Sequence, residues 1–430
     1  MLFEKIAVLT QDEQVQPELY VAVQEDSIAY VGRERPKGDF GRRYDGRGKL
    51  LMPGLVNAHS HAPMTLLRGY AEGLSLQAWL NERVFPFEAR LTGQDVYFGS
   101  LLAYAEMLRF GVTASADMYF FGQDMAKAVL DSGMRANICL SVTCFDDRAF
   151  EELPVYEETL RLLESSQGAG NGRLRVDACL HAEYSSTPKV VAGVADFARR
   201  MGLRVHVHLS ETRQEHEACK ARWGLTPAAY LERQGLLENP GIAAHCVHCE
   251  EGDRQILAKH GVSAACNPVS NLKLASGILD APAMLRSGVN LCLGTDGAAS
   301  NNNLNLFEEM KDLALLSKGL LGDPCAVSAQ QALRAATRGG ALALGREDCG
   351  LIKAGLKADL VVLDAEKPWW SPRFDGPAQL CFGAQGSDVV LTMVDGRVLY
   401  EDGRWLTIDV EEARDQVQRR AERIAAELGA

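Results

Sequence analysis

The hydrophobic pattern has the same texture at the two ends of the chain and a different one between them. Apolar and polar residues alternate in strand fashion at 5–9, 19–23 and 27–31, and again at 358–363, 389–394 and 397–400. Asp395-Gly396 lies between the last two segments and indicates a hairpin. Neither end has enough strands to bury a two-sided sheet alone. We therefore predict that both ends join in one small β-sandwich.

Between the two ends, apolar segments alternate with amphipathic helical segments, several of which end at a glycine. Strands are predicted at 51–59, 113–119, 135–143, 174–181, 204–209, 241–247, 262–267 and 289–295. Their near-continuous apolar runs are typical of a parallel sheet covered on both faces. Eight such units predict an α/β fold, a (β/α)8 TIM barrel. A doubly wound open sheet is the alternative, but it requires a glycine-rich phosphate turn after its first strand.

These elements divide the chain into three parts. Residues 1–52 and 346–408 are predicted to form the composite β-sandwich, and residues 53–345 the barrel. Residues 409–430 form a charged amphipathic helix with Val410, Val417, Ile424 and Leu428 on one stripe. We expect this helix to pack on its own barrel. A contact between two copies of the chain, giving a homo-oligomer, is the alternative.

The composition excludes several classes of partner. Among 430 residues the net charge is −12 and no long basic run occurs, which argues against nucleic acid as a partner. No apolar run reaches the roughly 20 residues that a membrane-spanning helix needs. Residues 1–5 lead directly into a strand pattern, without the features of a signal peptide. The 11 cysteines lie mostly within apolar segments, as expected for reduced thiols in a cytoplasmic protein, and we interpret the Cys246 and Cys249 pair as core residues.

Side chains that can ligate a metal ion lie where the predicted barrel strands end. His59 and His61 close the first strand and lie on one face of it, because strand side chains alternate. His208 ends the fifth strand and Asp296 follows the eighth. The carboxyl ends of barrel strands meet at one face, so these four side chains are predicted to share one metal ion. An acid after a strand is often only a helix cap, but four such residues at the correct strand ends favour a catalytic metal.

Three imidazoles and one carboxylate suit a single Zn²⁺, with Fe²⁺ or Mn²⁺ as alternatives. A bound zinc lowers the pKa of its water to about 7 and makes hydroxide available. Glu211, three residues after His208, is positioned to shuttle protons, and His245 at the end of the sixth strand and Asp296 are further candidates. A bridged two-metal site would need a lysine after the fourth strand, where the sequence has His181-Ala182-Glu183.

These motifs resemble those of the amidohydrolase superfamily, and within it the methylthioadenosine/S-adenosylhomocysteine deaminases. The resemblance covers essentially the whole chain and rests on five segments in family order, at 59–69, 208–211, 243–248, 267–274 and 294–302, followed by 355–361 near the C-terminus. It implies zinc on the four residues named above, with Glu211, His245 and Asp296 in proton transfer. It also implies that water attacks C6 of an adenine ring and that ammonia leaves, which is hydrolysis of a cyclic amidine C–N bond.

The resemblance also implies substrate-binding residues. Glu88 matches a family glutamate that holds the ribose hydroxyls, and His181 matches a histidine that contacts the substrate, although the residues after it depart from the family pattern. The family's substrate-binding arginine has no clear counterpart, and Arg148 is the candidate. Apart from the resemblance, Trp79 lies on a predicted helix after the first strand; core packing is its favoured role, and a wall of the nucleoside pocket is the alternative. The remaining histidines are interpreted as buried and hydrogen-bonded (His206, His248) or as surface residues (His216, His260).

The expected substrates are therefore small 5′-modified adenosines: methylthioadenosine, S-adenosylhomocysteine, adenosine and 5′-deoxyadenosine. Two alternatives remain open. One is a deaminase or chlorohydrolase of another heterocycle, such as guanine, a pterin or a triazine, because the metal ligands cannot separate these substrates. The other is a barrel without activity that serves as a structural or binding module.

Overall fold

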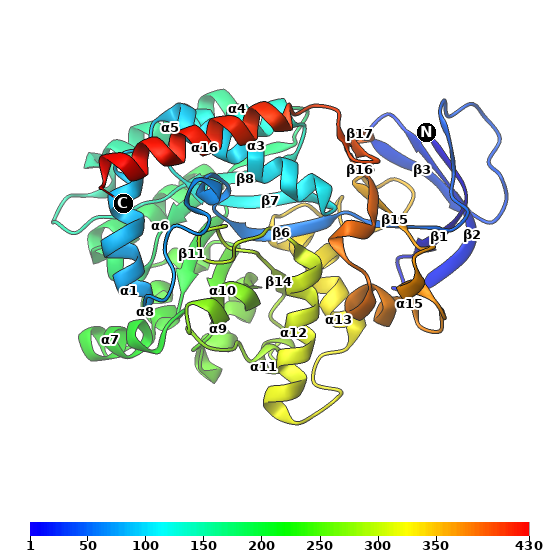
Figure 1. The fold of residues 1–430 in the computed structure, drawn as a ribbon. Helices are drawn as coiled ribbons and strands as arrows, with labels where there is room; N and C mark the ends of the chain where they lie inside the picture. The colour runs from blue at the N-terminus through cyan, green and yellow to red at the C-terminus, as the bar shows by residue number, and fades with distance from the viewer. Residues whose placement is uncertain (430) are drawn as a thin grey trace.

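The computed structural model describes residues 1–429 as a barrel beside a β domain that both ends of the chain build (Figure 1). The β domain is one nine-stranded sheet in the order β18-β17-β16-β15-β5-β1-β2-β3, with β4 paired to β1. Its strands are β1 (Leu2–Leu9), β2 (Val15–Gln24), β3 (Ser27–Gly32), β4 (Arg43–Asp45), β5 (Lys49–Pro53), β15 (Leu360–Asp364), β16 (Val389–Val394), β17 (Arg397–Glu401) and β18 (Arg404–Trp405). The pairing of β5 with β15 joins the two chain ends, as predicted.

This sheet curves back on itself around its own core. Ser27 at the start of β3 forms an isolated bridge with Lys357, and the amide of Ile28 donates to the carbonyl oxygen of Leu356 at 2.8 Å. The enclosed apolar side chains come from both chain ends and include Phe3, Ile6, Val21, Leu51, Leu360 and Met393. The strands that we assigned to a sandwich are thus hydrogen-bonded in a single folded sheet.

The barrel strands are parallel and nearly all buried on both faces, which confirms the predicted fold class. They are β6 (Leu55–Ser60), β7 (Val112–Tyr119), β8 (Arg135–Leu140), β9 (Leu174–Val176), β10 (Ala178–Leu180), β11 (Val205–Leu209), β12 (Gly241–His245), β13 (Val262–Cys266) and β14 (Leu291–Leu293). The fourth strand is interrupted at Asp177, so that β9 pairs with β8 while β10 pairs with β11. A bridge between Ser60 and Asp296 closes the ring between the first and eighth strands.

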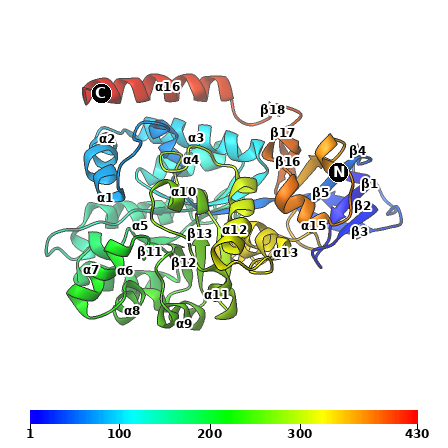
Figure 2. The ribbon, with the colours of Figure 1, turned by 60° about the horizontal axis from the view of Figure 1, so that its bottom comes forward.

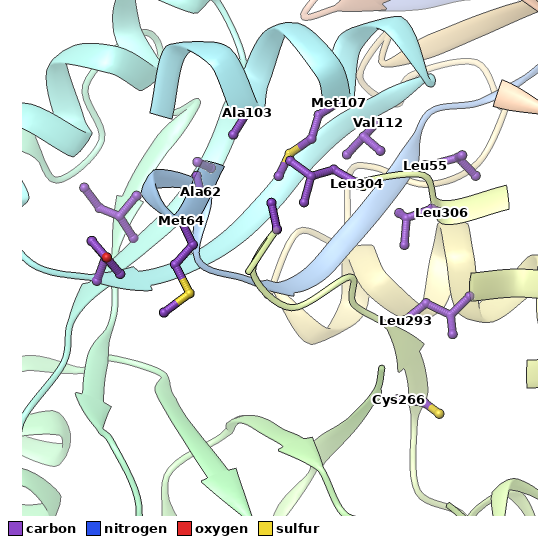
Figure 3. Packing of buried hydrophobic residues seen from close by; sticks show 14 of the residues in the cluster. Leu55, Ala62, Met64, Ala103, Met107, Val112, Cys266, Leu293, Leu304 and Leu306 are labelled. Carbon is purple, nitrogen blue, oxygen red and sulfur yellow. The ribbon is translucent and has the colours of Figure 1, made fainter. Parts of the chain in front are cut away.

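Helices cover the outside of the barrel. The main ones are α3 (Gly93–Arg109), α4 (Gly122–Ser132), α5 (Pro154–Ser166), α6 (Pro188–Met201), α7 (Arg213–Trp223), α8 (Pro227–Arg233), α9 (Glu251–His260), α10 (Pro268–Lys273), α11 (Ala281–Arg286), α12 (Leu306–Leu321) and α13 (Ala329–Arg334). Shorter ones are α1 (Leu76–Trp79), α2 (Phe85–Glu88), α14 (Gly340–Ala343) and α15 (Gly376–Ala378). Figure 3 shows how their apolar faces meet the strands, with Met107 of α3 and Val112 of β7 near Leu304.

The segment predicted as one strand at 51–59 is in fact two strands in different sheets. β5 ends at Pro53 in the β domain and β6 begins at Leu55 in the barrel. The break falls at Gly54, where a Cβ atom would lie 2.0 Å from Oγ1 of Thr113. An apolar run shows no boundary at this point, because both strands are buried and only the glycine marks the change of sheet.

The C-terminal helix α16 (Val410–Glu427) lies across α3 of its own barrel, as expected (Figure 2). Its Val417 and Ile424 are buried, and Arg420 and Arg423 pair with the buried carboxylate of Asp95 at 2.9 and 2.8 Å. We propose that the units 1–52 with 346–408, 53–345, and 409–430 are the domains of this chain; residue 430 lies outside the described residues. Within the described residues, no helix is both long and apolar enough to cross a membrane.

A buried ion network joins the barrel to the β domain. The guanidinium of Arg135, on β8, donates to Asp359 at 2.6 Å and to Asp395 at 2.9 Å, and all three side chains are buried. Lys357 adds a partly buried ammonium 3.3 Å from Asp395. The network neutralises two carboxylates at an interface that excludes water.

Arg135→Met should therefore destabilise the protein strongly, by about 3–5 kcal/mol, because it leaves the buried carboxylate of Asp359 without a cation and that of Asp395 with Lys357 alone. The midpoint of urea unfolding, followed by tryptophan fluorescence, measures this effect. Lys127→Met is the matched control, since it breaks an exposed pair with Asp131 and should cost about 0.5 kcal/mol or less. Equal shifts for the two variants would contradict the assigned role of the network.

Candidate metal centre and active site

Four side chains from three strands converge at the carboxyl end of the barrel. Nε2 of His61 lies 3.2 Å from Oδ1 of Asp296, and Nε2 of His59 lies 3.5 Å from the same oxygen. Nε2 of His208 lies 3.3 Å from Nε2 of His61. The structure thus brings together the four residues that the sequence predicts as metal ligands. Their ligand atoms face one point at the end of β6, β11 and β14.

The donor set fits a divalent metal ion. Nε2 of His59 is fully buried and has no hydrogen-bond partner among the described residues, an arrangement that is costly unless an ion occupies the point it faces. The other ring nitrogen of each histidine is held: His61 Nδ1 by the carbonyl oxygen of Met118 (2.6 Å) and His208 Nδ1 by that of His181 (2.8 Å). His59 Nδ1 meets Nε2 of His206 at 2.9 Å. Such partners orient a ligating imidazole.

The carboxylate of Asp296 is fixed by two hydroxyl groups that the sequence analysis did not identify. Ser270 Oγ donates to Oδ2 at 2.6 Å and Ser300 Oγ donates to the same oxygen at 2.9 Å. These contacts leave Oδ1 directed toward the histidines. Both serines lie in motifs noted in the sequence, but nothing in their spacing indicates this role.

Several site residues adopt backbone conformations that L-amino acids rarely use. The φ angles of Ser210, His245 and Asp296 are 47°, 70° and 60°. Non-glycine residues in this region are uncommon, and such strain is concentrated at functional sites. Each of these residues lies at or just after a strand end. The unusual backbone turn there directs the side chain of that residue, or of its neighbour, into the site.

Glu211 and His245 lie beside the ligand cluster, where the sequence places them. Oε2 of Glu211 is 3.7 Å from Nε2 of His245, while Oε1 accepts a hydrogen bond from Ser276 at 2.9 Å. His245 Nδ1 donates to the amide oxygen of Asn271 at 2.8 Å. Burial raises the pKa of Glu211, an effect that His245 opposes. Glu211 therefore has one free oxygen and a raised affinity for a proton.

A cavity of about 220 Å³ opens onto this cluster. Glu88, His181 and Trp79 line it, together with His61, Glu211 and Asp296. Burial raises the pKa of Glu88 to about 7, although Tyr119 and His61 lower it. His181 is held by a contact of 2.9 Å between Nδ1 and Oγ of Ser185, and burial lowers its pKa to about 4. The cavity thus places Glu88 and a neutral His181 around the same space as the metal ligands.

Other candidate residues lie elsewhere. Arg148 does not line the cavity: its side chain is 52 % exposed and pairs with Asp146 at 2.9 Å. His216 was expected at the surface, but it is buried, because α7 packs its first turn against Ser210, whose Oγ lies 3.1 Å from Nδ1 of His216. His206 is buried as expected, His248 binds the carbonyl oxygen of Ser276, and His260 pairs with Glu232.

Comparison with known proteins agrees with this geometry. A sequence profile described as "Amidohydrolase family" matches residues 50–399. The chain belongs to the amidohydrolase family. It is 42% identical over 410 residues to a 5-methylthioadenosine/S-adenosylhomocysteine deaminase of Pelotomaculum thermopropionicum, covering 94% of this chain and 93% of the relative. It is 43% identical to a 5′-deoxyadenosine deaminase of Methanosarcina barkeri, with 95% and 94% covered.

A solved structure of the family has the same fold along its whole length. It is an adenosine deaminase from Xanthomonas campestris with bound zinc, 34% identical to this chain, with a TM-score of 0.92. The match covers 99% of this chain and 98% of that one. The curved β domain and the barrel are therefore common to this chain and a family member that holds a metal.

The metal content of variants tests the ligand assignment. His208→Ala should hold well under one metal ion per chain after dialysis, because it removes an inward-facing nitrogen donor. His206→Leu should keep the ligands but weaken metal affinity by about 10- to 100-fold, since it removes the partner that orients His59. Elemental analysis and competition with a chromophoric chelator measure both. His260→Ala, at a distant ion pair, is the control, and an unchanged affinity in His208→Ala would contradict the assignment.

Proposed function

We propose that this chain is a zinc-dependent hydrolytic deaminase of 5′-modified adenosines that releases the inosine analogue and ammonia. The proposal rests mainly on the cavity. Its lining includes residues of the ligand cluster with Glu211 and His245, and also a further carboxylate, Glu88. The names and coverage of the relatives support the same substrate class. In this proposal His59, His61, His208 and Asp296 hold the metal.

A bound zinc ion supplies a nucleophile, because it lowers the pKa of water enough for hydroxide to form at neutral pH. Residues of the chain itself accept and donate the protons of the reaction. Oε2 of Glu211 is the oxygen free to take a proton, since Oε1 is held by Ser276. Nδ1 of His245 donates to an amide oxygen, so Nε2 carries the lone pair and is free to accept a proton. Addition of water at C6 and loss of the amino group as ammonia complete the exchange.

Glu88 binds the ribose in this proposal. An ionised carboxylate can accept hydrogen bonds from two neighbouring hydroxyl groups at once. His181 and Trp79 line the same cavity and contact the nucleoside, His181 as a neutral imidazole. A free base has no ribose, so Glu88 separates this function from that of a guanine, pterin or triazine hydrolase.

We further propose that the protein acts in a reducing compartment such as the cytoplasm. All eleven cysteines are without a disulfide partner in the part of the chain that the structure describes, and nine of them are buried. This pattern is typical of proteins kept reduced.

The direct test is turnover by the zinc-loaded protein. Methylthioadenosine, adenosine and 5′-deoxyadenosine should each be converted to the inosine analogue. The fall in absorbance at the adenine band and the release of ammonia measure this conversion. Glu211→Gln should keep its zinc while kcat falls by about 10²–10⁴, because the proton carrier is lost. Absence of turnover for every nucleoside would reject the proposal, and normal turnover in Glu211→Gln would reject the assigned role.

Glu88 predicts a distinct pH dependence. Because burial raises its pKa to about 7, the carboxyl is neutral below that pH and cannot accept from both ribose hydroxyls. The value of kcat/KM for nucleosides should therefore fall as the pH drops from 7 to 5, by up to about tenfold per unit. Glu88→Gln should have a low kcat/KM at every pH and a shallower decline below pH 7, because only the metal-bound water then still titrates in this range. A decline that persists unchanged in Glu88→Gln would assign it to another group.

A further inference from the structure

Among the described residues, the side chains that line the cavity include acids and imidazoles but no permanently cationic group. Its charged lining groups are the carboxyl groups of Glu88, Glu211 and Asp296, and no lysine or arginine lines it among residues 1–429. The wall formed by residues 76–85 is apolar, with Leu76, Trp79, Leu80, Val84 and Phe85, and Phe120 and Phe145 extend this apolar surface. A substrate that enters this cavity meets aromatic and aliphatic surface around a few acidic groups.

The lysine and arginine residues within three positions of a lining residue do not themselves line the cavity, as Arg148, Lys273 and Arg83 illustrate. Arg148 lies three residues after Phe145 and pairs with Asp146. Lys273 precedes Leu274 and pairs with Glu72 at 3.1 Å. Arg83 precedes Val84 on the π-helical turn Leu80–Val84 and is exposed, whereas Leu80 and Val84, the two ends of that turn, are buried against the cavity. Among the described residues, no guanidinium or ammonium group lines the cavity to pair with a substrate carboxylate.

We propose that the preferred substrates are adenosines with a short, uncharged 5′ group, such as 5′-deoxyadenosine and methylthioadenosine, and that zwitterionic amino-acid tails are disfavoured. This inference rests on the proposed function and narrows its substrate class. The relatives' names include both kinds of nucleoside, so the preference is a property of this chain's cavity.

The physical reason is the cost of an unpaired charge. A tail carboxylate in this cavity would leave water without gaining a lysine or arginine as its partner, and the metal ion is engaged at the adenine ring rather than at the tail. The tail's ammonium group cannot offset this cost through Glu88, because Glu88 is occupied by the ribose. A thioether methyl group, in contrast, packs favourably against aromatic rings such as Trp79 and Phe85. Charge, rather than length, is therefore expected to set the preference.

Competing nucleosides separate charge from length. The value of kcat/KM for methylthioadenosine should exceed that for S-adenosylhomocysteine by on the order of 100-fold, as expected for an unpaired polar group in a closed site. An adenosine with a neutral 5′-butylthio chain of similar length should stay within about tenfold of methylthioadenosine. Comparable values for S-adenosylhomocysteine and methylthioadenosine would overturn the inference. So would a butylthio analogue as poor as S-adenosylhomocysteine, since length would then explain the preference.

A designed cation provides a second test. Phe145 lines the cavity and is 78% exposed, so Phe145→Arg places a guanidinium at the mouth without disturbing the core. It should raise kcat/KM for S-adenosylhomocysteine relative to methylthioadenosine by about tenfold, whereas Phe145→Gln, of similar polarity but neutral, should not. An equal change of this ratio in both variants would contradict the charge argument. If no nucleoside is turned over by the zinc-loaded protein, the proposed function fails instead.

Discussion

Closure of the barrel between its first and eighth strands is the constraint on which the site depends. The amide of Asp296 donates to the carbonyl oxygen of His59 at 3.0 Å, and the side chain of Asn57 binds Thr295 through both its oxygen and its nitrogen. The strands approach so closely that a Cβ atom at Gly294 would lie 2.7 Å from the carbonyl oxygen of His59. This contact between distant segments places a carboxylate opposite two imidazoles, and a looser closure would separate them.

The same rigidity determines how each ligand points. β7 holds His61 twice: the carbonyl oxygen of Met118 contacts its ring, and the buried carboxyl of Asp117 accepts from the next amide, that of Ala62, at 2.9 Å. Backbone carbonyls cannot rotate away, so they restrict the ring more than a surface side chain could. The strained turns at His245 and Asp296 persist for the same reason, because surrounding hydrogen bonds and packing determine them. Orientation is therefore built into the strand ends before any ion binds.

The sequence was sufficient to predict the fold class and to locate His59, His61, His208 and Asp296, because strand periodicity and the barrel rule both act locally and place strand ends on one face. It was insufficient for Ser270 and Asn271, which lie on the short helix α10, and for Ser276 in the loop after it, because a helix of under two turns and a loop have no periodicity from which side-chain direction can be predicted. The single apolar run across Gly54 concealed a change of sheet for a related reason: two buried strands in succession look like one. Arg148 was a candidate by resemblance only, and its position depends on a loop whose path no pattern specifies.

In the proposed function, the wall that carries Glu88 separates substrate choice from the metal chemistry. The ligands stand on strands that the whole fold stabilises, whereas Glu88 ends a short helical segment, α1 to α2, that contains a π-helical turn. Such turns are frequent at functional sites. Burial there makes the Glu88 carboxylate costly to ionise, and two ribose hydroxyls are donors that would favour its ionised form. A free base would leave that cost uncompensated, so the same burial that raises the pKa of Glu88 favours a nucleoside over a base.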